Sequence, residues 1–493
     1  MSLIFDADKF EVITVTEEGR TVRFRAFENI PYCERPADEK QQRLSVYVPE
    51  EYYAGRTINR YDINSAPVFF PNSVGGYMPG PQERPGEDMF RHETNASLFA
   101  LIKGYVVVSP GVRGRGMKDR DGKNIGIAPA HIVDLKAAVR YLKANADRIP
   151  GNMEHIISNG TSAGGAISSL LGATGSHPDY EPYLKEIGAA DADDSIFAAS
   201  CYCPITNLDH ADMAYEWEFN GLNDYHGVRM EEPGPGEHEP HFISVAGDMS
   251  TEQVKMSGEL KSLFIDYLNG LGLKDKSGKK LTLDDNGNGS FKDYIADRIA
   301  TSANDELDRV RAGRTDSCVG RKYVAVRNMT DNTRLEPADV KAVAIENEKV
   351  TGVDFDAFVE HRTRMKVTPA FDGIPVGTPE NELFGTADVP ARHFTGFSMA
   401  HDEAAANLAD ETQVRLMNPM NYVDDERALK ARHYRIRHGA VDRDTSLAIS
   451  EMLALKLAGA GVDTDIEHPW GIPHAGDYDL DGLFAWIDGI CKE

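Results

Sequence analysis

The chain has 493 residues, of which 41% are apolar, and its 79 acidic residues outnumber 53 lysines and arginines to give a formal net charge of -26 at pH 7. This excess of negative charge argues against a broad phosphate-binding surface, so we expect no nucleic acid partner. The length and the apolar fraction allow a large buried core and roughly two to four domains.

Strand and helix patterns alternate through the first two hundred residues. Some strand-like segments alternate polar and apolar residues, as antiparallel strands do, whereas others are continuous apolar runs typical of central strands. The predicted strands are 9–30, 42–49, 66–72, 104–111, 155–160 and 196–205. The predicted helices are 129–145 and 163–175. This order predicts an α/β fold with a mostly parallel sheet and helices on both faces.

The pattern changes between residues 207 and 410, which are polar and irregular. Residues 230–240 form a loop rich in Pro, Gly and Glu, and residues 251–271 have the spacing of an amphipathic helix, but no succession of buried strands follows. We therefore predict an inserted domain over 207–410. The α/β core is predicted in two parts, 1–206 and 411–493.

The alternation of helices and strands resumes after the inserted segment. The predicted elements there are a helix over 410–419, a strand over 433–439, a helix over 446–461, an edge strand over 462–470 and a closing helix over 481–492. Late strands and helices of this kind complete a parallel sheet.

Residues 160–164 read GTSAG and match the G-x-S-x-G pattern of a nucleophile elbow. They lie between a predicted strand and a predicted helix, which is the context that the motif requires. The small flanking residues let the chain turn sharply and expose the hydroxyl of Ser162 at the start of a helix. We therefore predict that Ser162 is a catalytic nucleophile; the alternative is a glycine-rich turn.

A serine hydroxyl needs a base to take its proton and an acid to orient that base. In this arrangement the acid follows a late strand, and the histidine precedes the last helix. His474 lies in the predicted loop before the closing helix, and both Asp442 and Asp444 follow the strand over 433–439. We favour Asp442 because it ends an HGxxD turn, with Asp444 as a second carboxylate beside the site or a surface residue.

The oxyanion formed during acyl transfer needs two backbone N–H donors. One comes from the residue after the nucleophile, here Ala163, and the other from a loop after an early strand. Gly75 and Gly76 lie in such a loop, residues 71–81, and we prefer Gly76 as the donor. A plain tight turn is the alternative.

The chain has five cysteines without the spacing of a disulfide framework or a zinc site: Cys33, Cys201, Cys203, Cys318 and Cys491. The first residues lack the basic and apolar regions of a secretion signal, and no apolar run reaches the roughly 18 residues that span a bilayer. We expect a cytoplasmic protein that binds no membrane and no metal, with a monomer favoured.

The motifs together resemble the bacterial tannases, which are tannin acyl hydrolases of the α/β-hydrolase fold with a large inserted lid. The resemblance covers nearly the whole chain, through LIFDAD, PNSVGGYMPGP, ISNGTSAGG, YCPITNLDHADMAYEWEFNG, RIRHGAVDRDTS and PWGIPHAGDYDL. It implies that Ser162, Asp442 and His474 form a catalytic triad and that the segment over 207–410 is the lid.

The resemblance also implies a galloyl-binding set of Lys366, Glu380 and Asp444 and a reaction without a cofactor. Three adjacent phenolic hydroxyls suit carboxylate acceptors and an ammonium donor. Fungal tannases and related feruloyl esterases carry cysteines beside the nucleophile and the histidine, whereas this chain has Thr161 and Ala475 there. That branch is therefore excluded.

We expect a serine esterase that releases gallic acid from galloyl esters and depsides by way of an acyl-enzyme. The alternatives on the same fold are a feruloyl-type or other aromatic-acid esterase and a peptidase. A binding protein with an inactive hydrolase fold is a further alternative, against which the intact order Ser, Asp, His argues.

Overall fold

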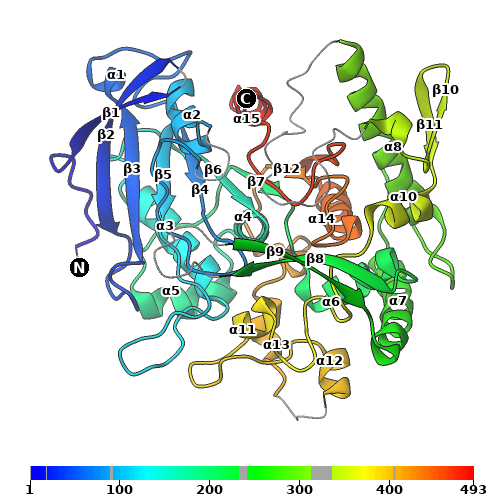
Figure 1. Cartoon of the computed structure of the whole chain (residues 1–493). Coiled ribbons are helices and arrows are strands. Elements are labelled where there is room, and N and C mark those ends of the chain that lie inside the picture. The colour runs from blue at the N-terminus through cyan, green and yellow to red at the C-terminus, as the bar shows by residue number, and fades with distance from the viewer. Residues whose placement is uncertain are drawn as a thin grey trace.

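The computed structural model describes residues 2–17, 19–88, 93–231, 241–312, 336–402 and 407–492. A nine-stranded sheet runs through the molecule in the order β1-β2-β3-β5-β4-β6-β7-β12-β13 (Figure 1). Its strands are β1 Glu11–Glu17, β2 Arg20–Pro31, β3 Arg43–Pro49, β4 Pro67–Pro71, β5 Val106–Pro110, β6 Asn152–Thr161, β7 Ala198–Tyr202, β12 His433–Arg437 and β13 Asp463–Glu467.

The sheet is mostly parallel, which confirms the predicted α/β class. The first three strands pair antiparallel, β3 pairs antiparallel with β5, and the six strands from β5 to β13 in the sheet order are parallel. The continuous apolar runs became β4 and β5, both buried at every residue, whereas β1 alternates in exposure. Strands covered on both faces need apolar residues throughout, and strands at an open edge do not.

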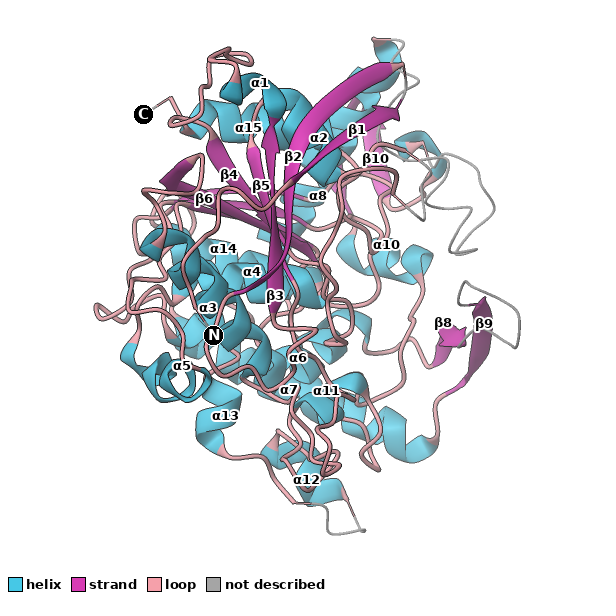
Figure 2. Cartoon of the chain, turned by 90° about the vertical axis from the view of Figure 1, so that its left-hand side faces the viewer, coloured by secondary structure: helices cyan, strands magenta, loops and turns pink. Residues whose placement is uncertain are grey.

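Helices cover both faces of this sheet. Figure 2 shows α2 and α15 on one side and α3 and α4 on the other; Phe99 of α2 stacks on Phe484 of α15. The helices of the core are α1 Glu50–Tyr53, α2 Ala96–Lys103, α3 Ala130–Ala144, α4 Ala163–Ala173, α5 Glu181–Ile187, α14 Leu447–Gly459 and α15 Leu480–Ile490. The predicted helices over 129–145, 163–175, 446–461 and 481–492 are confirmed to within a few residues.

The segment between β7 and β12 adds no strand to the central sheet among the described residues. Its strands pair only with each other, β8 with β9 and β10 with β11. Its elements are α6 Leu208–Phe219, β8 Asp224–Glu231, β9 His241–Asp248, α7 Thr251–Leu271, α8 Ser290–Arg311, β10 Val343–Glu346, β11 Lys349–Val353, α10 Phe355–Arg362, α11 Pro379–Leu383, α12 Gly396–His401 and α13 Glu411–Arg415.

Two details of this segment differ from the sequence prediction. The loop predicted over 230–240 begins inside strand β8, which continues to Glu231, while residues 232–240 lie outside the described part of the chain. The helix predicted over 410–419 ends early, at Arg415, before a short turn of 3-10 helix over Pro419–Asn421. Pro419 lacks a backbone N–H and cannot continue an α-helix.

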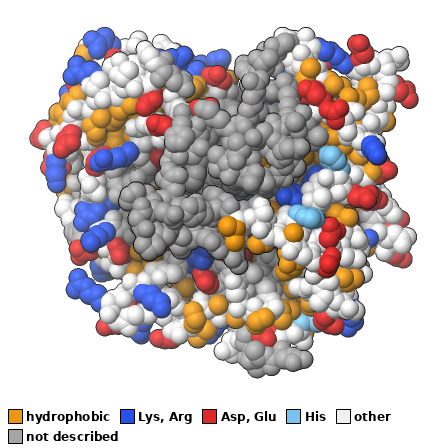
Figure 3. Space-filling model, viewed as in Figure 1, with side chains coloured by type: hydrophobic (Ala, Val, Ile, Leu, Met, Phe, Trp, Pro, Cys, Tyr) orange, Lys and Arg blue, Asp and Glu red, His pale blue; other side chains and the backbone are white. Residues whose placement is uncertain are grey.

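The surface carries charges of both signs. Among the described residues on the face in Figure 3, acidic and basic side chains are intermingled, and no single basic patch is gathered there. Within the described segments, no helix combines the length and the apolar character that crossing a membrane requires.

Candidate active site

Ser162 lies at a sharp turn between β6 and α4. Its φ of 60° and ψ of -122° are unusual for a residue with a side chain and are typical of a strained nucleophile elbow. A Cβ atom at Gly160 would lie 2.4 Å from the carbonyl oxygen of Gly164, and one at Gly164 would lie 2.7 Å from Oδ1 of Asn72. The turn therefore needs glycine on both sides of the serine.

The loop after β4 is joined to the elbow by Asn72, a residue that no sequence motif singled out. Its buried side-chain amide donates to the carbonyl oxygens of Asn159 and Gly164, each at 3.1 Å, and to Oγ of Ser168 at 2.9 Å. The signal that could have identified it is an amide residue at the end of a buried strand. Asn72 thus fixes the loop against the strand and helix that flank Ser162.

Both predicted oxyanion donors lie in these two segments. Ala163 is the first residue of α4, whose N-terminal N–H groups have no partner within the helix. Gly76 lies in the loop after β4 with a φ of 53°, and its carbonyl oxygen accepts a hydrogen bond of 2.6 Å from Nε of Arg115. Arg115 therefore restrains the Gly76 peptide. The donor roles of Ala163 and Gly76 stay predictions.

His474 and Asp442 form a buried pair at the carboxyl edge of the sheet. Nδ1 of His474 lies 2.8 Å from Oδ2 of Asp442, and the backbone N–H of Asp444 donates to the other oxygen of Asp442 at 2.8 Å. The carboxylate of Asp444 lies farther off, with Oδ2 at 3.8 Å from Nδ1 of His474. Of the two candidate acids, Asp442 is therefore the one that can orient the imidazole.

Three contacts join the elbow, the end of β7 and the histidine loop. A Cβ atom at Gly476 would lie 1.7 Å from Oγ1 of Thr161, so the chain two residues after His474 touches the residue before Ser162. The backbone N–H of Ser162 donates to the carbonyl oxygen of Tyr202 at 3.0 Å. The next residue, Cys203, has its Sγ 3.9 Å from Nε2 of His474. The chain thus places Ser162, His474 and Asp442 at neighbouring strand ends.

The pKa values of the buried pair move in opposite directions. Burial lowers the pKa of His474, but Asp442, Asp444 and Cys203 outweigh it and raise that pKa well above its usual value. Burial raises the pKa of Asp442, yet His474 and His438 hold it well below its usual range. The surroundings therefore favour the imidazolium beside a carboxylate, which is the charge state that a general base acquires in acyl transfer.

His438 is a second histidine against the same carboxylate. Its Nε2 lies 3.3 Å from Oδ2 of Asp442, and its Nδ1 lies 2.8 Å from Oγ of Ser450. Burial lowers the pKa of His438, which favours the neutral ring. His438 is the first residue of the HGxxD pattern, which by itself indicates no role for it.

The three predicted galloyl-binding residues come together across the boundary between core and inserted segment. Nζ of Lys366 donates to the carbonyl oxygen of Asp444 at 2.7 Å and lies 3.6 Å from its Oδ1. Glu380 is only 8% exposed. Burial raises its pKa and Asp444 raises it further, while Lys366 and Arg115 act in the opposite direction. Lys366 and Asp444 thus form an ion pair beside His474, and the buried Glu380 lies within electrostatic reach of both.

Buried ion pairs attach the inserted segment to the turn that carries Asp442. Arg362 of α10 pairs with Glu218 of α6 at 2.7 Å, and it also donates to the carbonyl oxygen of Asp442. The other oxygen of Glu218 accepts from Oγ of Ser446 at 2.6 Å and from the N–H of Leu447 at 2.9 Å. Removing either partner of a buried ion pair leaves the other charge uncompensated and strongly destabilises the fold. Glu218 and Arg362 therefore hold the turn of Asp442 against the inserted segment.

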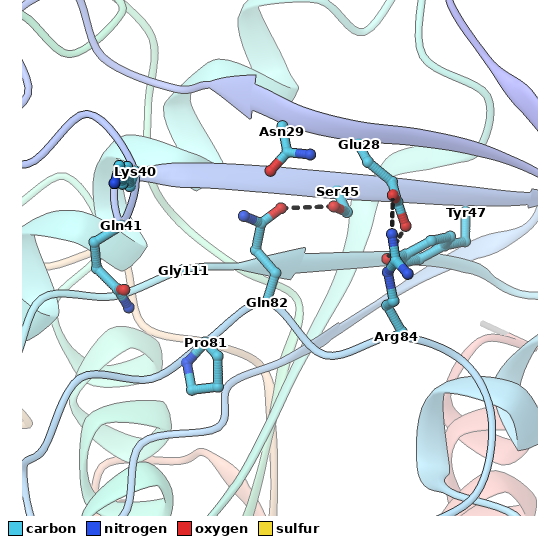
Figure 4. Close-up of a pocket in the computed structure, with 10 residues that line it drawn as sticks. All are labelled: Glu28, Asn29, Lys40, Gln41, Ser45, Tyr47, Pro81, Gln82, Arg84 and Gly111. Carbon is cyan, nitrogen blue, oxygen red and sulfur yellow. Dashed lines mark hydrogen bonds and ion pairs between the residues drawn. The ribbon is translucent and has the colours of Figure 1, made fainter.

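A separate hollow of about 290 Å³ opens beside β2 and β3 (Figure 4). Its side chains are largely paired with each other, Arg84 with Glu28 and Ser45 with Gln82 at 2.6 Å. Its lining residues are Glu28, Asn29, Lys40, Gln41, Ser45, Tyr47, Pro81, Gln82, Arg84 and Gly111. None of them is a predicted nucleophile, base or acid, so the hollow is not the active-site candidate.

The four free cysteines in the described part of the chain are Cys33, Cys201, Cys203 and Cys491. Cys318 lies outside the described residues. Only Cys203 among these four has its sulfur beside the His474 imidazole.

A family model and a mycobacterial esterase each match only a part of this chain. A family model described as BD-FAE matches residues 75–216. Esterase LipC of Mycobacterium tuberculosis is 41% identical over 58 residues, which is 12% of this chain and 14% of the length of LipC.

Three solved structures match nearly the full length. Tannase from Lactobacillus plantarum is 42% identical with a TM-score of 0.92, over 99% of this chain and 100% of that chain. Fusobacterium nucleatum tannase is 44% identical with a TM-score of 0.89, over 99% of both chains. A tannin acyl hydrolase in complex with ethyl gallate is 42% identical with a TM-score of 0.88, again over 99% of both chains.

Proposed function

This chain belongs to the family of bacterial tannases, and we propose that it hydrolyses galloyl esters by way of an acyl-enzyme on Ser162. The observation that carries the mechanism is the buried hydrogen bond of 2.8 Å between His474 and Asp442, next to the strained turn at Ser162. A tannin acyl hydrolase of the same family is solved with ethyl gallate, which supports a galloyl ester as the substrate.

In the first half-reaction, Nε2 of His474 accepts the proton of the Ser162 hydroxyl as its Oγ attacks the ester carbonyl carbon. Asp442 holds Nδ1–H, which leaves the lone pair of Nε2 available to accept that proton. When the tetrahedral intermediate collapses, the imidazolium returns the proton to the departing alcohol oxygen. A water molecule, activated in turn by His474, then attacks the acyl-enzyme, and gallic acid leaves.

The negative charge of the tetrahedral intermediate falls on the former carbonyl oxygen. We assign its stabilisation to the backbone N–H groups of Ala163 and Gly76, at the start of α4 and in the loop after β4. Donors fixed in advance act strongly in a buried site because they need not reorient during the reaction. Asn72 and Arg115 hold these two segments in place.

Recognition of the galloyl ring falls to Lys366, Glu380 and Asp444. The phenolic hydroxyls donate to the two carboxylates, and the ammonium group donates to a phenolic oxygen. Lys366 and Glu380 come from the inserted segment and Asp444 from the core. We propose that residues 207–410 act as a lid that completes the acyl-binding site.

The test compares methyl gallate, methyl ferulate, methyl benzoate and a peptide amide as substrates of the purified protein. We expect the highest kcat/KM for methyl gallate and no turnover of any of them by a folded Ser162→Ala variant. Preference for methyl ferulate or the amide would instead identify a feruloyl-type esterase or a peptidase. Hydrolysis retained by Ser162→Ala would eliminate the nucleophile assignment.

A further inference from the structure

A thiol lies against the nitrogen of His474 that Asp442 leaves open. Cys203 follows β7, is completely buried, and has its Sγ 3.9 Å from Nε2 of His474. One side-chain ligand atom from each of Cys203, Asp442 and His474 falls within 4.8 Å of the others. Cys203 and His474 are 271 positions apart in the chain, so their spacing forms no metal-binding sequence pattern.

The separation between these two atoms suits a bridging cation. Zinc bonds a thiolate at about 2.3 Å and an imidazole nitrogen at about 2.0 Å, which places sulfur and nitrogen roughly 3.5 to 4 Å apart at tetrahedral or slightly wider angles. Cadmium accepts the same soft thiolate and imidazole donors. Little movement of Cys203 or His474 is therefore needed to admit such an ion.

The surroundings of His474 also match those of a metal-binding histidine. Histidine ligands usually donate their other ring N–H to a carboxylate, which fixes the tautomer and makes the ligating nitrogen more basic. Nδ1 of His474 makes this bond to Asp442 at 2.8 Å. Asp442 is itself held by the N–H of Asp444 and lies against His438, so it serves as the orienting carboxylate and not as a ligand.

We propose that Cys203 and His474 form an inhibitory site for a thiophilic divalent cation such as Zn²⁺ or Cd²⁺. Binding forms a bond from the metal to Sγ of Cys203 and another to Nε2 of His474. The thiol proton, and any proton on Nε2, pass to the solvent. Solvent completes the coordination. The ion is an inhibitor and not a cofactor, because hydrolysis requires the nitrogen that the ion occupies.

The loss of ester hydrolysis on cation binding rests on the proposed function. The binding of the cation itself does not depend on that function. With the Nε2 lone pair bonded to metal, His474 cannot accept the proton of Ser162. A chelator that removes the ion should restore the activity. The thiol would then act as a metal-sensitive switch beside the base.

The test titrates metal-free protein with Cd²⁺, followed by the thiolate-to-cadmium absorption band, and with Zn²⁺, followed by calorimetry. The variants are Cys203→Ser, His474→Gln and, as a matched control, Cys491→Ser, which removes a half-buried thiol elsewhere. We expect one tightly bound ion in the wild type and in Cys491→Ser. Cys203→Ser should lose the band, and both Cys203→Ser and His474→Gln should bind Zn²⁺ at least tenfold more weakly.

Circular dichroism of each variant establishes that it is folded before the comparison is made. A band that persists in folded Cys203→Ser, or one lost in Cys491→Ser, would overturn the proposed site. Unchanged Zn²⁺ affinity in folded His474→Gln would overturn the role of the imidazole. Because these readouts need no substrate, a protein that binds Cd²⁺ as expected but fails to hydrolyse methyl gallate would contradict only the proposed function.

Discussion

The two aspartates beside His474 should respond differently to replacement by asparagine. Asp442 is fully buried and lies 2.8 Å from Nδ1 of His474. Asp444 lies 3.8 Å from the same atom, is partly exposed to solvent and forms an ion pair with Lys366. We predict that Asp442→Asn impairs the hydrolysis of every ester and that Asp444→Asn impairs chiefly the hydrolysis of esters with ring hydroxyls.

The expected magnitudes differ between the two variants. Asparagine at the acid position of a Ser-His-Asp triad leaves the geometry intact but stabilises the wrong tautomer of the base, which lowers kcat by about 10⁴-fold. A hydrogen bond between a phenol and the Asp444 carboxylate contributes about 1.5 to 3 kcal/mol. Its loss corresponds to a decrease of roughly 10- to 150-fold in kcat/KM for methyl gallate.

The assay measures kcat/KM for methyl gallate and methyl benzoate at a pH where His474 is neutral in all variants. Methyl benzoate lacks the hydroxyls, so its kcat/KM should change little in Asp444→Asn and fall in Asp442→Asn as much as that for methyl gallate. Equal losses on both esters in Asp444→Asn would refute its role in reading the ring. A small effect of Asp442→Asn would refute its role as the orienting acid.

Three further predictions concern the residues around the site. Burial raises the pKa of Glu380, so the folded state binds its proton more tightly than the unfolded state does. The ionised carboxylate therefore destabilises the fold at pH values above its folded pKa, and this destabilisation disappears at pH values below its unfolded pKa. Glu380→Gln should thus raise Tm at neutral pH while lowering kcat/KM for methyl gallate, and a lower Tm would be inconsistent with this. Because Asp444 helps to raise the pKa of His474, Asp444→Asn should move the acidic limb of the pH profile for methyl benzoate to lower pH, and a shift to higher pH would contradict the electrostatic account. Asn72→Ala removes three buried hydrogen bonds and should lower the free energy of unfolding by roughly 2 to 4 kcal/mol, whereas the exposed control Asn64→Ala should change it little; chemical denaturation of both variants checks the difference.

Local patterns predicted the parts of the site that depend on neighbouring residues. The strand before Ser162 and the helix after it are short-range features, and a Cβ at Gly160 would meet the nearby carbonyl oxygen of Gly164, so GTSAG could be read as an elbow. The order of Ser162, Asp442 and His474 could be inferred from the succession of strands, because the carboxyl ends of parallel strands meet at one edge.

Contacts between distant segments could not be predicted in this way. The HGxxD pattern favoured Asp442, but only the distances to Nδ1 of His474, 2.8 Å from Asp442 and 3.8 Å from Asp444, distinguish the two carboxylates. The roles of Asn72 and Cys203 arise only when the loop after β4 and the end of β7 pack against the elbow and the histidine loop. The hairpin forms when β8 pairs with β9, which lies on the far side of residues 232–240, and the mostly polar β8 lacks the apolar signal of a buried strand.

The nucleophile is tested most directly by labelling the purified protein with a fluorophosphonate and locating the label by peptide mass spectrometry, with and without gallate as a protecting ligand. We predict complete inactivation, one label on Ser162, slower labelling in the presence of gallate and no label in Ser162→Ala. Full esterase activity after fluorophosphonate treatment, with Ser162 unmodified, would contradict the assignment of Ser162 as the nucleophile. Inactivation by a label on another residue would contradict it as well.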